Sequence, residues 1–391
     1  PRREELSTKT TTAATTTTTR PSKLQKMITR SMTALVMFFA FVAMLKAGHV
    51  AVCFVLICLQ TQAFSELVNL RYKEAKERDM PWFRSLQWAW FTVAMLYAHG
   101  SSWLKAPMGF DKAVFENVVG AEQGNHLVFF EFFSFGLFVA VFILSVLSLK
   151  QGLYDYQITQ FVWTIAVLLL VVLQMKTLVF NIYNGLFWFV FPFLSVVVND
   201  VSAYFAGIAL GRKLFKNATF LSLSPNKTWE GFLGALVLTL VWAYYSAPTL
   251  GRMFGCSYLE VQKGMDGAEC RHYDLFSTPN GPGGRTQFPI QVHAVCIAMF
   301  ASLVAPFGGF LASGIKRATG IKDFNNIFPG HGGVVDRMDC QFIMCCFVHL
   351  YYSTFIASGA MMTVAQIVDH AKRLTPAEQE QLVATLAAMA K

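Results

Sequence analysis

Carboxylate, basic and glycine residues gather in one short stretch of the chain, from Ser313 to Asp339. The carboxylates in this stretch include Asp323, Asp336 and Asp339. Magnesium binds carboxylate oxygens while it keeps several waters and contacts substrate phosphates. The composition therefore predicts a magnesium site built on these aspartates, for chemistry on a phosphate group.

Phosphoryl-type transfer explains why basic residues and glycines surround the aspartates. Its transition state spreads negative charge over oxygens, so the protein mainly positions groups and neutralises charge. Cationic side chains serve as phosphate clamps, and glycines let backbone N–H groups approach phosphate oxygens closely. The residues predicted to hold phosphates are Lys316, Arg317, Lys322, Arg337, His331, Gly332 and Gly333. For His331, a structural hydrogen-bonding role is an equally good interpretation.

A second polar segment runs from Asn199 to Gly231. Asp200 follows an apolar run, so we expect it at the cytoplasmic end of a membrane span. There it either binds metal, or caps a helix or bonds a neighbouring one. Ser224 and Lys227 are candidate substrate contacts, although Ser224 and Thr228 would also suit the N-cap of the next helix.

These residues belong to a chain that is too apolar for a soluble protein. Hydrophobic residues make up 54% of its 391 residues, and charged residues only 14%. Soluble globular domains carry roughly 25% charged residues. Hydrocarbon must therefore surround much of the surface. The cysteines show no metal-binding spacing, and no nucleic-acid-binding pattern is present.

The predicted fold class is all-α: a polytopic transmembrane helical bundle of about nine spanning helices. A spanning helix needs about 20 mainly apolar residues. The candidate spans are Met32–Leu45, His49–Phe64, Leu86–Ala98, Leu127–Leu147, Phe161–Met175, Leu178–Val198, Phe232–Tyr245, Ile290–Leu311 and Phe342–Met362.

Basic residues set the predicted orientation. The positive-inside rule places the N-terminus and both polar segments in the cytoplasm, and the loop Pro248–Pro289 on the far side. Cys256 and Cys270 share that far loop, where a disulfide could persist; two unpaired thiols are the alternative. We expect residues 1–26 to form a disordered Thr-rich cytoplasmic leader, 27–365 the membrane domain, and 366–391 a short helical tail.

Two runs of fixed polar positions carry a family resemblance. They read Ser313-x-Ile315-Lys316-Arg317-x4-Lys322-Asp323 and Phe328-Pro329-x-His331-Gly332-Gly333-Val334-x-Asp336-Arg337-Met338-Asp339. Together they resemble the signature of the CDP-diacylglycerol synthases, the phosphatidate cytidylyltransferases, most of all the eukaryotic branch. Asn199-Asp200 and Ser224–Gly231 look like the family's second region. Asn325 and Phe328 depart from the usual residues, which concerns the packing of the loop more than the activity.

The resemblance implies transfer of CMP from CTP to phosphatidate, which gives CDP-diacylglycerol and pyrophosphate, with Mg2+ as cofactor. It implies catalytic roles for Lys322, Asp323, Asp336 and Arg337, and substrate contacts from Ser224, Lys227, Lys316, Arg317, His331, Gly332 and Gly333. The implied metal ligands are Asp323, Asp336 and Asp339, with Asp200 as a further candidate. The implied partners are CTP, phosphatidate and membrane lipids but no nucleic acid, in the endoplasmic reticulum. A homodimer is left open.

Two other functions compete with this interpretation. A CTP-dependent lipid kinase of the dolichol type would transfer the γ-phosphate, and the complete His-Gly-Gly-x2-Asp-Arg-x-Asp run speaks against it. A transporter would also place ionisable groups at span ends. The charges here collect on one side of the membrane instead of running through it, which disfavours a transport path.

Overall fold

A computed structural model describes most of the membrane-embedded part of the chain. The described residues are 23–72, 80, 82–105, 123–211, 213, 227–262, 275–276, 289–357, 371, 375–376, 378–380 and 382–383. Ser224 and Cys270, which the sequence singles out, lie outside these ranges, as do residues 1–22 of the expected leader.

The described chain is built from helices. The elements of the first half are α1 (Lys23–Lys46), α2 (His49–Asn69), α4 (Phe83–Lys105), α6 (Gln123–Leu147), α7 (Tyr154–Leu168), η1 (Leu169–Leu173) and α8 (Gln174–Tyr183). Those of the second half are α9 (Phe187–Leu210), α10 (Trp229–Phe254), α11 (Tyr258–Gln262), α13 (Pro289–Leu303), α14 (Pro306–Thr319), α15 (Val335–Tyr351) and η2 (Tyr352–Ala357). The β contact within these residues is an isolated bridge between Phe328 and Gly332.

The helices confirm the predicted polytopic membrane fold. Eight helical stretches of the described chain are long and apolar enough to cross a membrane. They are Ile28–Lys46, His49–Asn69, Phe130–Leu147, Tyr154–Tyr183, Phe187–Leu210, Trp229–Phe254, Ile290–Thr319 and Val335–Ala357. The further span predicted over Leu86–Ala98 lies in α4, which has 23 residues and packs against α6 and α7.

One predicted span boundary is wrong. The sequence places a break after Met175, where Lys176 interrupts the apolar run. In the structure α7, η1 and α8 follow one another without a break from Tyr154 to Tyr183. The chain turns instead at Gly185, whose φ of 137° is a conformation that favours glycine. The chain thus carries a charged lysine inside a span, where the prediction had placed it at a span boundary.

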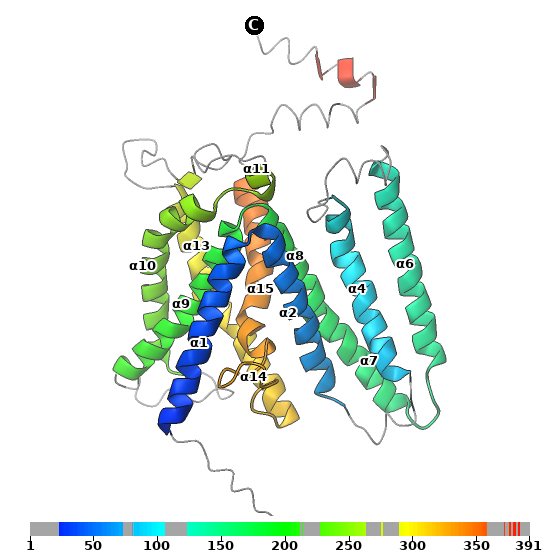
Figure 1. Cartoon of the computed structure of the whole chain (residues 1–391), viewed down its shortest axis with the longest axis horizontal. Coiled ribbons are helices and arrows are strands. Elements are labelled where there is room, and N and C mark those ends of the chain that lie inside the picture. The colour runs from blue at the N-terminus through cyan, green and yellow to red at the C-terminus, as the bar shows by residue number, and fades with distance from the viewer. Residues whose placement is uncertain are drawn as a thin grey trace, which may run out of the picture.

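Successive spans run in opposite directions, so the bundle has two ends (Figure 1). The start of α1 and the segment between α14 and α15 lie at one end, which we call the α14 end. α11 and the turns that join α1 to α2 and α8 to α9 lie at the other, the α11 end. Ring contacts agree, because Tyr258 of α11 lies 5.7 Å from His49 and 5.2 Å from Tyr183 between centroids. This relative placement matches the alternation expected from the sequence.

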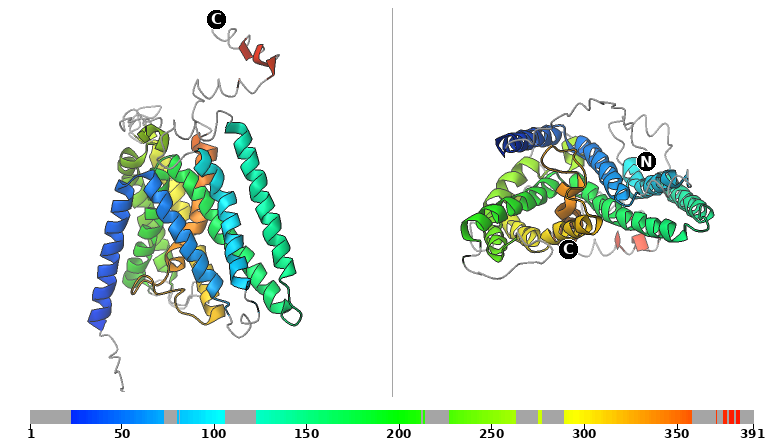
Figure 2. Two further views of the ribbon diagram at one scale, coloured as in Figure 1. Left: turned by 45° about the vertical axis from the view of Figure 1, so that its right-hand side comes forward. Right: turned by 90° about the horizontal axis from the view of Figure 1, so that it is seen from below.

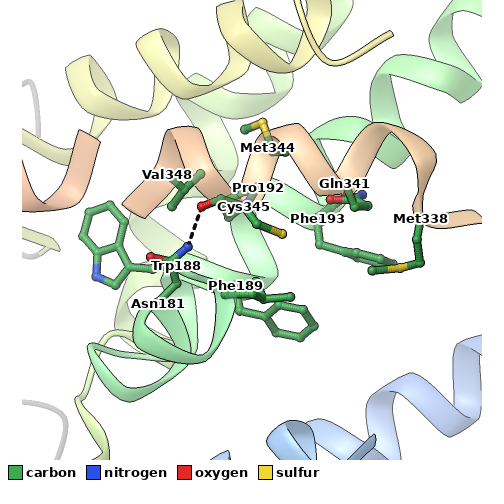
Figure 3. A pocket seen from close by; sticks show the side chains of 11 residues that line it. Asn181, Trp188, Phe189, Pro192, Phe193, Met338, Gln341, Met344, Cys345 and Val348 are labelled. Carbon is green, nitrogen blue, oxygen red and sulfur yellow. Dashed lines mark hydrogen bonds between the residues drawn. The ribbon is translucent and has the colours of Figure 1, made fainter. Parts of the chain in front are cut away.

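Helix α15 occupies the middle of the bundle, with α9 and α10 toward one edge and α6 at the other (Figure 2). It packs against α2, α8, α9, α13 and α14. Side chains fix its rotation, because Asn181 of α8 donates to the carbonyl of Cys345 at 3.2 Å (Figure 3). Gln341 in turn donates to the carbonyl of Phe193 at 3.3 Å. Polar side chains on the first turns of α15 are therefore held in a defined direction.

Small residues bring α9 and α10 into close contact. A Cβ on Gly231 would lie 3.0 Å from the carbonyl oxygen of Ala203, and one on Gly234 would lie 2.6 Å from the Cβ of Ala206. Such residues let membrane helices approach closely. The hydroxyl of Thr228 caps α10 by accepting from the amide of Gly231 at 3.1 Å. The start of α10 is therefore held against α9.

A disulfide-bonded cysteine lies at the α11 end. Cys256 follows α10 and is disulfide-bonded. The other cysteines of the described chain are free thiols. The expected partner, Cys270, lies outside the described residues.

Candidate active site

Asp336 is the best-anchored carboxylate of the polar stretch. It lies buried in the first turn of α15, and Lys316 of α14 donates to its Oδ1 at 2.7 Å. The backbone amides of Phe324 and Gly333 donate to its Oδ2, each at 2.9 Å. The carboxylate thus joins α14, the loop after it and the start of α15. This geometry gives Asp336 a structural role that the sequence did not predict, and its role as a magnesium ligand stays a prediction.

Glu66 is a second buried carboxylate that holds this region, and the sequence prediction missed it. It lies in the last turn of α2 and is only 4% exposed. Its oxygens accept from the amides of Val334 at 3.0 Å and Val335 at 2.9 Å, at the N-terminus of α15. A carboxylate there satisfies unpaired amides and interacts favourably with the helix dipole. A lone acidic residue near the end of an apolar helix is the signal that could have identified it.

The glycines of the His-Gly-Gly turn make room for these two carboxylates. A Cβ on Gly332 would lie 2.7 Å from Asp336 Oδ2, and one on Gly333 would lie 2.5 Å from a Glu66 oxygen. Gly332 also has a φ of 84°, which strains other residues. The amides of His331 and Gly332 donate to the carbonyl of Phe328, and that of Gly333 donates to Asp336. These amides therefore serve the turn itself, whereas the sequence suggested that they bind phosphate.

Asp200 and Asp339 form an acidic pair between α9 and α15, and Asp339 Oδ1 accepts from the amide of Cys340 at 2.8 Å. Asp200 lies inside α9, which continues to Leu210, so the predicted position at the end of a span is wrong. Ten residues of helix correspond to about 15 Å, so Asp200 lies about that far along α9 from its end. It is exposed at the surface of the molecule and lies within electrostatic reach of Asp339, Lys227 and Arg337. Asp339 projects from α15 next to Gly309 of α14.

Basic residues surround the acidic pair from several elements. Lys227, just before α10, has its ammonium 4.3 Å from the ring centroid of Phe310 on α14. Lys316 pairs with Asp336 and also lies within electrostatic reach of Asp339. Arg317, Lys322 and Arg337 are exposed at the same end. Of the predicted clamps, Lys227, Lys316 and Arg337 lie within electrostatic reach of the acidic pair, and Lys316 is already engaged by a buried carboxylate.

The carboxylates predicted to bind metal do not all converge. Among the residues that the structure describes, no three His, Cys, Asp or Glu side chains are grouped as a metal site. Asp323 is exposed in the loop, and Asp336 is bonded to protein groups. Asp200 and Asp339 do fit magnesium, because the metal needs only one or two carboxylates beside substrate phosphates. Two neighbouring carboxylates also repel one another unless a cation lies between them.

His331 stays a candidate for substrate contact. It is half-buried, and its Nδ1 has no hydrogen-bond partner among the described groups. Buried polar atoms are normally hydrogen-bonded. The ring therefore has a nitrogen available for a ligand. Ser224 lies outside the described residues and cannot be placed.

An apolar groove leads to Asp339 from between the helices. It has a volume of about 180 Å3 and is formed by α2, η1, α8, α14 and α15. Its lining includes Leu67, Leu170, Phe307, Leu311, Phe342 and Asp339. The groove therefore has a charged residue, Asp339, at one side and mainly apolar side chains, suited to hydrocarbon, along its other walls.

The sequence is similar to those of known cytidylyltransferases. A model of the cytidylyltransferase family matches residues 28–355. The chain is 40% identical over 356 residues to a probable phosphatidate cytidylyltransferase of Dictyostelium discoideum, covering 86% of this chain and 72% of the relative. It is 35% identical over 387 residues to phosphatidate cytidylyltransferase 1 of Arabidopsis thaliana, covering 95% and 89%. The human phosphatidate cytidylyltransferase 1 is 33% identical over 373 residues, covering 91% and 77%.

Proposed function

Because the chain belongs to the cytidylyltransferase family, we propose that the charged site between α9, α14 and α15 transfers CMP from CTP to phosphatidate. The products are CDP-diacylglycerol and pyrophosphate. The observation that supports this most is the acidic pair Asp200 and Asp339, surrounded by basic residues and adjoining an apolar groove. A nucleoside triphosphate needs the charged residues, and a lipid phosphate needs both charged residues for its headgroup and an apolar groove for its acyl chains.

Asp200 and Asp339 would hold Mg2+, with Asp323 as a further candidate that the loop carries toward bound substrate. The metal supplies neutralisation of charge on the phosphates of CTP. Asp336 acts as a positioning residue in this proposal. Its bonds to Lys316, Phe324 and Gly333 keep the loop in place beside the acidic pair.

The basic residues orient the two substrates. Lys227, Arg317, Lys322 and Arg337 bind the triphosphate and the phosphate of the lipid, since cations pair strongly with phosphate oxygens. The phosphatidate oxygen attacks the α-phosphorus of CTP, the bond to the β-phosphate breaks, and pyrophosphate leaves. No side-chain nucleophile is required. The reaction depends on positioning and charge neutralisation, which exposed lysines and arginines can supply.

The groove that ends at Asp339 would receive an acyl chain of phosphatidate. Its leucine and phenylalanine walls suit hydrocarbon, and Asp339 marks the place where the headgroup would begin. Because α14 and α15 form the groove together with α2 and α8, the lipid would enter from the side of the bundle.

We assign the α14 end to the cytoplasm, in an internal membrane such as the endoplasmic reticulum. This assignment rests on the basic residues at that end, including Arg71, Arg317 and Lys322, under the positive-inside rule. A homodimer is compatible with this assignment but is not required by it.

One assay tests the proposal. Purified protein in detergent receives CTP with a labelled α-phosphate, phosphatidate and Mg2+. Label should appear in the lipid and unlabelled pyrophosphate should be released, both only when Mg2+ is present. Release of CDP with phosphate transfer to the lipid would instead show a CTP-dependent kinase, and absence of any lipid product would reject both.

A further inference from the structure

A second and larger apolar groove lies away from the candidate active site, between α4, α6 and the helix that runs from α7 to α8. Its main part has a volume of about 440 Å3. A neighbouring cavity of about 220 Å3 continues it toward the α14 end, and Trp90 lines both. Ligand sites commonly have volumes of about 300–1,000 Å3. The lining contains none of the residues assigned to the active site.

Lys176 brings a positive charge to this groove. It lines the main part, and Asp155 is the only other acidic or basic residue of the span Tyr154–Tyr183. Its ammonium lies 5.2 Å from the ring centroid of Tyr97, and the structure gives it no ion pair with a carboxylate of the described chain. Lys176 lies about 10 Å along the helix axis from the end of α8. An ionisable group at such a depth is costly and marks a functional site by default.

Ser134 of α6 adds a second polar group to the same groove. Its side chain is only 2% exposed and lines the main part. Its hydroxyl has no hydrogen-bond partner within the described structure. Since buried hydroxyls are nearly always bonded, the groove offers a donor as well as a cation. Both groups suit the oxygens of a phosphate diester.

Glu131 lies one helical turn before Ser134, on the same face of α6 and nearer the α11 end. It is exposed and does not belong to the lining of the groove. Residues three positions apart are neighbours on a helix surface. A ligand whose phosphate meets Lys176 and Ser134 would therefore extend its headgroup toward a carboxylate. This arrangement favours a headgroup with a cationic amine and disfavours one with a net negative charge.

We propose that this groove binds a zwitterionic phospholipid from the leaflet at the α11 end. The acyl chains lie along the apolar lining past Trp90 toward the α14 end. The phosphate pairs with Lys176 and accepts from Ser134, and the amine lies toward Glu131. The site is separate from the active site, so the proposal does not depend on which reaction the protein catalyses.

Native mass spectrometry of purified, delipidated protein tests the proposal, with no substrate present. Phosphatidylethanolamine and phosphatidylglycerol are added back separately. The wild type should retain phosphatidylethanolamine more tightly. Lys176→Gln keeps a flexible polar side chain but removes the charge, and should weaken retention roughly tenfold or more, the effect of one charge-assisted hydrogen bond. Glu131→Gln should abolish the preference between the two lipids.

Further variants separate a lost site from a damaged fold. Lys46→Gln removes an exposed charge at the same end of the bundle and outside the groove, and should bind lipid like the wild type. Ala94→Phe fills the groove and should lower retention of both lipids while the protein stays monodisperse. Unchanged retention in Lys176→Gln would overturn the proposal. A second copy of the chain on this face, with lipid retention unaffected by Ala94→Phe, would overturn it as well.

Discussion

At the scale of single residues, hydrogen bonds divide the carboxylates of the site into two kinds. Glu66 and Asp336 are buried, and backbone amides or Lys316 occupy their oxygens. Asp200 and Asp339 lie within electrostatic reach of one another and of cations, and the amide that bonds Asp339, from Cys340 at 2.8 Å, belongs to the next residue of its own helix. The first kind holds the loop in place, and the second is available for metal and substrate. The two kinds should respond differently to loss of charge.

Asp339→Asn should lower turnover by roughly 100- to 1,000-fold, or about 3–4 kcal/mol, because it removes an anionic oxygen from a preorganised site. The free energy of unfolding should change little, since within the described residues no ion pair joins the Asp339 side chain to another helix. The measurement is CDP-diacylglycerol formation as a function of Mg2+ concentration, together with thermal unfolding. Turnover and Mg2+ dependence like the wild type would remove Asp339 from the metal site.

Asp336→Asn should lose both stability and activity. The side-chain amide of asparagine has one oxygen and one NH2 group, whereas the backbone amides of Phe324 and Gly333 and the ammonium of Lys316 are all donors. The NH2 group would therefore face a donor, and Lys316 would lose its anionic partner. Breaking a buried ion pair by removing one partner costs about 3–5 kcal/mol. Thermal unfolding and turnover at saturating Mg2+ give the measurement. Full stability with lost turnover would mean that Asp336 contacts the metal after all.

Glu66→Gln tests the cap of α15. The substitution preserves the volume of the side chain but replaces one acceptor of the Val334 and Val335 amides by a donor. We expect a loss of about 1–3 kcal/mol in the free energy of unfolding. The kcat should fall as well, because the loop moves. Gly333→Ala should act in the same direction, since its Cβ would collide with the Glu66 carboxylate. Normal kcat in both variants would contradict a positioning role for Glu66.

At the scale of elements, close helix contacts determine how the site is assembled. α14 approaches α15 so closely that a Cβ on Gly308 would lie 2.2 Å from the carbonyl oxygen of Asp339. The groove beside Asp339 includes Gly308 in its lining. The contact therefore fixes both the direction of the acidic residue and the width of the groove.

Gly308→Ala should force α14 away from α15 and reduce activity more than tenfold, chiefly by raising the KM for phosphatidate. Gly136→Ala is the matched control, because its Cβ would meet nothing within 4 Å. Alanine is also the better helix former by about 1 kcal/mol, so the control should be neutral or stabilising. Kinetics with both substrates and thermal unfolding give the comparison. Equal effects of the two substitutions would show that the α14–α15 contact does not matter.

The sequence predicted the elements better than the contacts between them. Apolar runs of sufficient length predicted the spans, because that signal is local. That the polar motif carries the site stays a prediction. The predicted span boundary at Lys176 was wrong, because a single charge inside a long apolar helix has the same sequence pattern as the end of a span. The role of Glu66 depends on α2 meeting α15, and the engagement of Asp336 depends on α14 and the loop after it meeting α15. The hydrophobic periodicity of a single segment does not predict contacts between helices that are far apart in the sequence.

At the scale of the whole molecule, the two ends of the bundle carry different chemistry. Most basic residues of the described chain, and the charged site, lie toward the α14 end (Figure 1). Cys256 and α11 lie at the other, where a disulfide would persist only outside the reducing cytosol. Orientation of the protein in its membrane therefore decides whether CTP, a cytoplasmic metabolite, reaches the site.

Single cysteines at the two ends test this orientation. In a Cys58→Ser background, Asn326→Cys places a thiol in the exposed loop at the α14 end, and Val261→Cys places one on α11. In sealed endoplasmic reticulum vesicles whose cytoplasmic face is outside, a membrane-impermeant maleimide should label position 326 at once. It should label position 261 only after detergent opens the vesicles, because nine crossings from a cytoplasmic N-terminus alternate the two ends. The background protein alone controls for the remaining cysteines. Labelling of position 261 in intact vesicles would invert the assigned orientation, and the site would then face away from CTP.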